Sequence, residues 1–77
     1  MARTQHDWSE IAKRVLKAEL KKRGVTYRGL AELLTQAGSP DTERNISNKV
    51  SRGGFSAAFF FEAMAAIGCH TVHLDHE

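Results

Sequence analysis

The sequence has few of the features that usually stabilise small domains. Its 77 residues include one cysteine, one proline and no pair of cysteines at metal-ligand spacing. Cys69 cannot close an internal disulfide, and structural zinc sites need paired ligands. A chain of this size buries only ~60% of the surface that its unfolded form exposes. Association with a second subunit is therefore the remaining route to extra stability.

Long apolar segments are also missing. The longest apolar stretch, residues 55–68, is interrupted by Ser56 and Glu62 and is too short to span a bilayer. The N-terminus lacks the apolar core of a signal peptide. We therefore expect a cytoplasmic protein that does not contact membranes.

Patterns that indicate catalysis or cofactor binding are absent or weak. The Gly53–Gly54 pair lacks the lysine and the spacing of a phosphate-binding loop. Cys69 lies near His70, His73 and His76, which are residue types of zinc sites and nucleophilic centres. In a strand, however, His70 and His73 point to opposite faces. We expect no enzyme activity, no metal, no cofactor and no small-molecule substrate.

Charge is distributed unevenly along the chain, whose formal net charge is +2. Residues 1–38 carry eight basic and four acidic side chains, whereas residues 39–77 carry three basic and five acidic ones. The first part therefore has a net charge of +4 and the second of −2. The basic part is suited to a polyanion, although charge alone does not determine fold or function. The run Lys21–Arg23 fits DNA contact and equally fits the negative end of a helix dipole.

Apolar periodicity and glycine spacing predict four helices in a single domain of residues 1–77. Asp7, Thr26 and Ser56 are suited to cap helix N-termini, as is either Ser39 or Thr42 before the third helix. Glycines follow at the points where helices end, because a left-handed residue is favoured there. The expected helices are 8–23, 27–37, 42–52 and 57–67.

The residues after Gly68 change to an alternating pattern, in which Val72 and Leu74 would share one face of a strand. We therefore expect a short C-terminal strand at about 71–75. The predicted fold class is mainly α, a four-helix bundle that contains a helix-turn-helix and ends in this one strand.

The helix expected at 57–67 is apolar on nearly all sides, because Glu62 is its only polar residue. Such a helix needs to be covered on more than one side, and a second subunit is the available cover. The strand at 71–75 also needs a partner, and its twofold-related copy would provide one. We predict a homodimer with an interface formed by Phe59, Phe60, Phe61, Met64, Val72 and Leu74.

The helix expected at 42–52 has the opposite composition, with Ile46 and Val50 as its only apolar residues. These two define the buried direction, and hydrogen-bonding side chains cover the rest of the helix. The helix is therefore either a weakly held surface helix or one that reads DNA. Arg44 and Asn48 lie opposite the buried direction, and their side-chain types pair bidentately with guanine and adenine.

Residues 25–34 and 45–53 resemble the helix-turn-helix of phage-repressor-like domains, also called lambda-repressor or Xre-type domains. The shared features are the pair Leu30–Ala31 and an Ile-Ser-x-x-x-Ser-Arg-Gly ending at 46–53. The resemblance implies base-reading positions at Arg44 and Asn48, and DNA-backbone positions at Tyr27, Arg28 and Arg52. From side-chain chemistry we add Asn45 as a base-reading residue, and Ser47, Lys49 and Ser51 as phosphate contacts.

Over a longer stretch, from Trp8 to Leu74, the chain is similar to a family of small bacterial domains of uncharacterised function. The matching segments are residues 13–20, 45–53 and 55–60. This second resemblance implies no activity.

Together these observations predict a sequence-specific protein that binds double-stranded DNA. It would be a transcriptional regulator, acting as a homodimer on an inverted repeat with its third helix in the major groove. The alternative is a non-enzymatic protein-interaction module that reuses the same helices, with a partner groove at Phe59, Phe60, Phe61 and Met64. Binding of RNA is a lesser variant.

Overall fold

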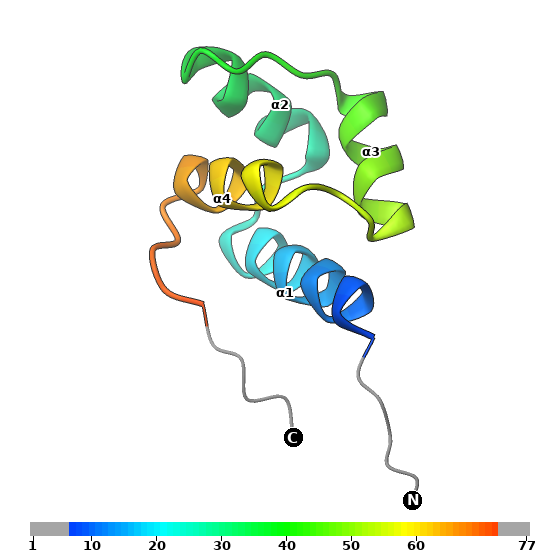
Figure 1. The fold of residues 1–77 in the computed structure, drawn as a ribbon. Helices are drawn as coiled ribbons and strands as arrows, with labels where there is room; N and C mark the ends of the chain where they lie inside the picture. The colour runs from blue at the N-terminus through cyan, green and yellow to red at the C-terminus, as the bar shows by residue number, and fades with distance from the viewer. Residues whose placement is uncertain (1–6, 73–77) are drawn as a thin grey trace, which may run out of the picture.

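The computed structural model describes residues 7–72, which form four helices around one core (Figure 1). The helices are α1 (Trp8–Arg23), α2 (Tyr27–Gln36), α3 (Glu43–Arg52) and α4 (Ala57–Ala66). Each bound lies within one residue of the bound predicted from the sequence, so the mainly α character is confirmed. Within these residues, no helix combines the length and the apolar character that a membrane span requires.

Each helix begins after a residue whose side chain accepts a hydrogen bond from a free backbone N–H. The Asp7 carboxylate accepts from the N–H of Glu10 at 3.2 Å, and Thr26 Oγ1 accepts from the N–H of Gly29 at 3.0 Å. The caps of α3 and α4 are Thr42 and Ser56, whose hydroxyl oxygens accept at 3.1 and 3.0 Å. Thr42, and not Ser39, is thus the N-cap residue of α3.

Gly53 ends α3 and brings it close to α1. Its φ of 73° is in the left-handed region, which glycine adopts without steric cost. A Cβ atom at this position would lie 3.1 Å from the Ser9 carbonyl oxygen and 3.6 Å from Cβ of Lys13. The last turn of α3 therefore contacts the first turns of α1.

The predicted C-terminal strand is wrong. No strand occurs within residues 7–72, and Thr71 and Val72 have no regular structure. The rest of the predicted strand, including Leu74, lies outside the described residues. The chain instead turns back over the end of α4, where the N–H of Cys69 donates to the Met64 carbonyl at 2.8 Å. Alternation alone was misleading, because a strand also requires a neighbour that pairs with its backbone.

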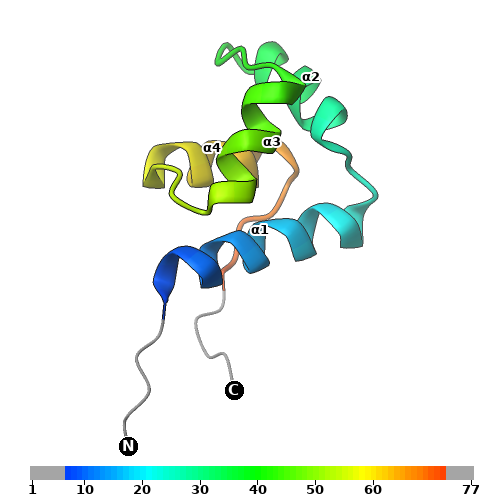
Figure 2. The same cartoon turned by 90° about the vertical axis from the view of Figure 1, so that its right-hand side faces the viewer.

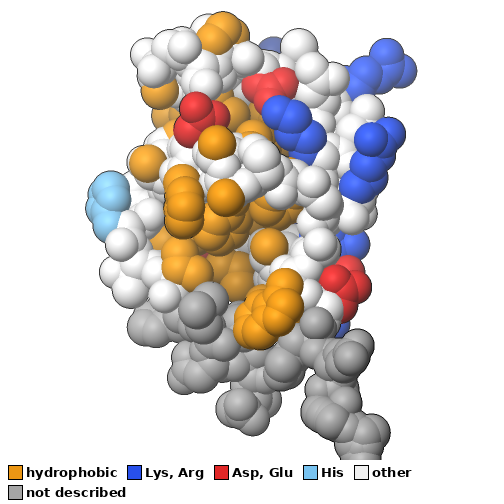
Figure 3. Space-filling view, in the orientation of Figure 1, with side chains coloured by type: hydrophobic (Ala, Val, Ile, Leu, Met, Phe, Trp, Pro, Cys, Tyr) orange, Lys and Arg blue, Asp and Glu red, His pale blue; other side chains and the backbone are white. Residues whose placement is uncertain are grey.

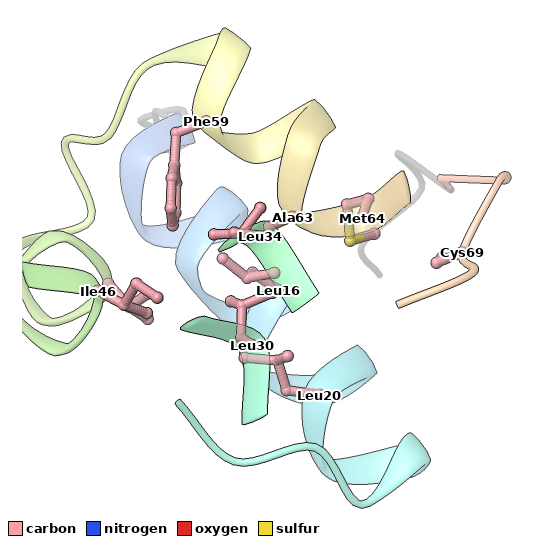
Figure 4. Close-up of a cluster of buried hydrophobic side chains, with 10 residues drawn as sticks. Leu16, Leu20, Leu30, Leu34, Ile46, Phe59, Ala63, Met64 and Cys69 are labelled. Carbon is pink, nitrogen blue, oxygen red and sulfur yellow. The ribbon is translucent and has the colours of Figure 1, made fainter. Parts of the chain in front are cut away.

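The core draws side chains from all four helices, and Figure 4 shows most of them converging. Ile46 and Val50 of α3 are fully buried, and Cys69 beyond α4 is also buried. Within residues 7–72, no polar or charged residue is buried. α2 packs against α3 and α4, and α1 packs against the same two helices. The other members are Leu16 and Leu20 from α1, Leu30 and Leu34 from α2, and Phe59, Ala63 and Met64 from α4.

Candidate nucleic-acid interface

α3 lies on one side of the molecule, and its outer surface faces the viewer in Figure 2. Because Ile46 and Val50 are both 0% exposed, the helix has one fully buried edge. The three predicted base-reading residues, Arg44, Asn45 and Asn48, are all exposed. Ser51 and Arg52 are also exposed, and Ser47 is half-buried on the flank. The structure therefore brings five of the predicted DNA-contacting residues of α3 onto one open surface.

Some of the cations of α1, α2 and α3 pair with a carboxylate, and others do not. On α1, Lys13 and Arg14 pair with Glu10, and Lys22 and Arg23 pair with Glu19. Within residues 7–72, no salt bridge is made by Lys17, Lys21, Arg28, Arg44 or Arg52. In Figure 3, Lys and Arg side chains gather along the edge of the molecule where α3 lies. These charges are available to an anion, as phosphate binding requires.

Lys49, predicted to contact the DNA backbone, is engaged within the protein. Its Nζ lies 2.6 Å from Oδ2 of Asp41, in the turn before α3. The same ammonium lies 4.5 Å from the ring centroid of Phe59 on α4. Lys49 therefore joins α3 to the preceding turn and to α4. This role of Asp41 was not predictable from local sequence patterns, because its partner is eight residues away across the helix start.

The Asp41 carboxylate is held in its charged form. Burial by itself would raise the pKa of Asp41, but hydrogen bonds from Lys49 and from the N–H of Thr42, together with the Lys49 charge, lower this pKa below its usual value. The N–H of Thr42 donates to Oδ1 at 2.9 Å. The pair is therefore intact at neutral pH.

The start of α2 carries the other predicted backbone contacts. Arg28 is exposed, whereas Tyr27 is half-buried and packs against the core. Arg28 lines a groove between α2 and α3 together with Glu32, Asp41 and Glu43. These carboxylates reduce the positive potential at the N-terminal end of α3. Arg52 lies at the C-terminal end of α3 and forms no salt bridge within residues 7–72.

Comparison with known proteins then places the chain in a family. A family model described as "Domain of unknown function (DUF6471)" matches residues 8–72. The chain belongs to this family. The predicted similarity to small uncharacterised domains is thus confirmed, whereas the comparisons give no support to the phage-repressor resemblance, which stays a prediction. No curated protein and no solved structure matches the chain.

The residues of the predicted dimer interface are not all available to a partner in this DUF6471 domain. Phe59 and Met64 are 5% and 2% exposed, because they fill the chain's own core. Phe60 is half-buried and stacks on Phe55 with ring centroids 6.1 Å apart. Phe61 is 64% exposed, and Val72 is exposed beyond the end of α4.

A second apolar surface residue was missed by the sequence analysis. Trp8, the first residue of α1, is 57% exposed. It lines a groove with Phe55, Ala57 and Phe60, between the start of α1 and the start of α4. Figure 3 shows apolar side chains across this face, beside the edge that carries the cations. The apolar face and the α3 surface are therefore separate. The position of this tryptophan at the start of a helix could have indicated its exposure, because a residue there lies at the border of the surface that packs on the core.

Proposed function

We propose that this protein binds double-stranded DNA in a sequence-specific manner and acts as a transcriptional regulator, with α3 in the major groove. The observation that carries the proposal is the exposed surface of α3. This surface offers Arg44 and Asn48 on one side of a helix whose apolar residues are completely buried. Asn45 is exposed beside them, but its side chain also hydrogen-bonds the Asp41 carboxylate. A ten-residue helix is about 15 Å long, and the major groove is about 12 Å wide.

The side chains divide into two roles. Arg44 and Asn48 are four residues apart and therefore share one face, where they would form bidentate contacts with guanine and adenine. Ser51 and Arg52, at the end of the helix, would contact phosphates and set the register. We assign Lys49 to positioning, because its ammonium is engaged with Asp41.

The resemblance to phage-repressor-like helix-turn-helix domains supports this assignment. In those domains the first helix of the motif crosses the DNA backbone and the second enters the major groove. Here α2 precedes α3 and packs against it. The apolar positions of the matching segments, Leu30, Ile46 and Val50, are all fully buried in one core.

We also propose that the protein acts as a homodimer through the apolar face formed by Trp8, Phe60 and Phe61. This face lies beside the α3 surface, so two copies can associate there while both reading helices stay accessible. A twofold dimer would read an inverted repeat whose half-sites are about one helical turn apart.

The DNA-binding proposal is tested by selecting bound fragments from random duplex DNA and then measuring two variants on the selected site. Arg44→Ala and Asn48→Ala should each lose about 10- to 100-fold in discrimination between this site and a scrambled duplex, because each removes a contact worth about 1–3 kcal/mol. Arg14→Ala is the matched control, since Arg14 is paired with Glu10 on α1. Equal discrimination by all four proteins would overturn the proposal.

A second candidate function is a protein-interaction module, which the exposed Trp8 and Phe61 favour. Exposed aromatic side chains beside a groove are common anchors for protein partners. Under this alternative, the selection would recover no preferred duplex. Arg44→Ala would leave partner binding unchanged, whereas Phe61→Ala would weaken it.

A further inference from the structure

Three lysines, Lys13, Lys17 and Lys21, follow one another at intervals of four residues along α1. Residues at this spacing lie on the same side of a helix. The structure shows which side this is, because Nζ of Lys13 donates to the carbonyl oxygen of Ser51 at 3.2 Å. Lys17 and Lys21 line a groove with Thr26 and Tyr27. We call these three residues the lysine row.

The lysine row connects two places that were predicted to contact the DNA backbone, of which the proposed function keeps the one at Ser51 and Arg52. One end lies at Ser51, next to Arg52, and the other lies at Tyr27. Figure 2 shows this course, with α1 passing below α3 towards the start of α2. Lys13 and Lys21 are eight positions apart, which corresponds to about 12 Å along the helix axis. The Lys13 end of the row therefore lies at the C-terminal end of α3, whereas Glu43 lies at its N-terminal end.

The other side of α1 has a different chemistry. Lys22 and Arg23 both pair with Glu19. These three residues line a hollow with Gly68–Thr71, beyond the end of α4. The cations on this side therefore share one carboxylate and lie beside the segment that follows α4.

The charges of Lys17 and Lys21 have no carboxylate partner within residues 7–72. Glu10 and Glu19 are engaged by other cations. Two like charges four residues apart destabilise a helix. The helix dipole explains Lys21 in the last turn of α1, but Lys17 lies before that turn. An anion bound from outside would relieve the repulsion at both positions.

We propose that Lys17 and Lys21 contact DNA phosphates beside the bases read by α3, so that α1 becomes a third element of the interface. The inference rests on the proposed DNA-binding function. It extends that function to Lys17, for which the sequence predicted no contact, and assigns Lys21, which the sequence left open between DNA contact and the helix dipole, to DNA. An ammonium group binds phosphate as a point charge and reads no sequence. The groove beneath also contains Ala18, Leu20 and Val25, which provide apolar surface for the lysine stems.

The test is the dependence of DNA affinity on salt concentration for the double variant Lys17→Gln/Lys21→Gln. Each phosphate contact contributes about 0.9 to the slope of log affinity against log salt. Between about 50 and 200 mM salt, the affinity of the parent should therefore fall about tenfold more than that of the variant. The ratio of affinities for the selected and scrambled duplexes should stay unchanged, because phosphate contacts act on all sequences alike.

The control is Lys22→Gln, which removes an exposed charge from the side of α1 where Lys22 and Arg23 share Glu19. Its slope should equal that of the parent. Circular dichroism checks that all variants keep the helical fold, as expected for exposed positions. If the double variant also keeps the parental slope, the lysine row is a solvated helix face and the proposal fails.

Two further outcomes separate this proposal from the function on which it rests. If the parent shows discrimination that Arg44→Ala removes, while the double variant keeps the parental slope, only the role of the lysine row is overturned. If the parent shows no salt-dependent binding to any duplex, both are overturned. In that case, an acidic protein that binds the parent but not the double variant would show that the groove binds protein and not DNA.

Discussion

At the scale of single residues, the Asp41–Lys49 pair has the clearest energetic consequence. The Asp41 side chain is only 11% exposed, and it joins the turn before α3 to the helix through the Lys49 ammonium at 2.6 Å. Because Lys49 also lies over the Phe59 ring, one side chain holds α3 against α4. The orientation of the reading helix therefore depends on a contact in the turn that the sequence analysis could not assign.

We predict that Asp41→Asn lowers the free energy of unfolding at pH 7 by about 1 kcal/mol. This is less than a fully buried charged hydrogen bond contributes, because Lys49 is partly solvated. The pKa of Asp41 is lowered in the folded state, so its contribution is present above the unfolded value of 3.8 and is lost as pH falls through the folded pKa. Urea unfolding over a pH series should show the two proteins converging in acid.

Glu32→Gln is the control for this pair, because Glu32 is exposed and forms no salt bridge within residues 7–72. Its effect on unfolding should stay within about 0.5 kcal/mol. An Asp41→Asn variant as stable as the parent at pH 7 would show that the pair does not hold α3 in place.

At the scale of elements, the helices were predictable because their signals are local. Asp7, Thr26 and Ser56 each cap a helix through the N–H three residues ahead, so a few neighbouring residues determine where the helix begins. The prediction of a strand at 71–75 was wrong for the opposite reason. A strand must pair with the backbone of residues far along the chain or in another subunit, which the local pattern does not reveal. The sequence did not decide whether Ser39 or Thr42 caps α3, because either hydroxyl satisfies the local pattern.

The placement of α3 depends on contacts between distant residues, and Gly53 provides one that is testable. Gly53→Ala should lower the free energy of unfolding by about 1–2 kcal/mol, because alanine is strained at a φ of 73° and its Cβ would lie 3.1 Å from the Ser9 carbonyl oxygen. Gly54→Ala is the matched control. No atom lies within 4 Å of a Cβ at Gly54, and the change should have an effect of less than about 0.5 kcal/mol. Thermal unfolding that shows the same stability for both variants would contradict the close packing of α3 on α1.

At the scale of the whole molecule, cations and apolar side chains occupy separate surfaces. Figure 3 shows Lys and Arg side chains at the edge where α3 lies and apolar side chains on the adjoining face. Trp8 lines a groove with Phe60, whose ring centroid lies 5.8 Å from that of Phe61. The apolar character of α4 predicts cover on more than one side, and α1 and α2 both pack against this helix within the chain. Phe59 and Met64 could not be told from Phe61 by type alone, because their burial depends on where α1 and α2 pack.

The proposed homodimer makes a prediction at this scale. Sedimentation should show a dimer at micromolar concentration for the parent and a shift towards monomer for Phe61→Ala, because this change removes an exposed aromatic ring without disturbing the core. Arg44→Ala, on the other surface, should remain a dimer. A monomeric parent would remove the proposed role of the apolar face and would leave the α3 surface unaffected.

The most direct test of the account is the ratio of the affinities of the parent for the selected and scrambled duplexes, compared with the same ratio for Arg44→Ala and Asn48→Ala. The account predicts a ratio well above one for the parent and a decrease of about 10- to 100-fold in each variant, with helical content unchanged. A ratio that is the same in all three proteins would show that α3 does not read DNA.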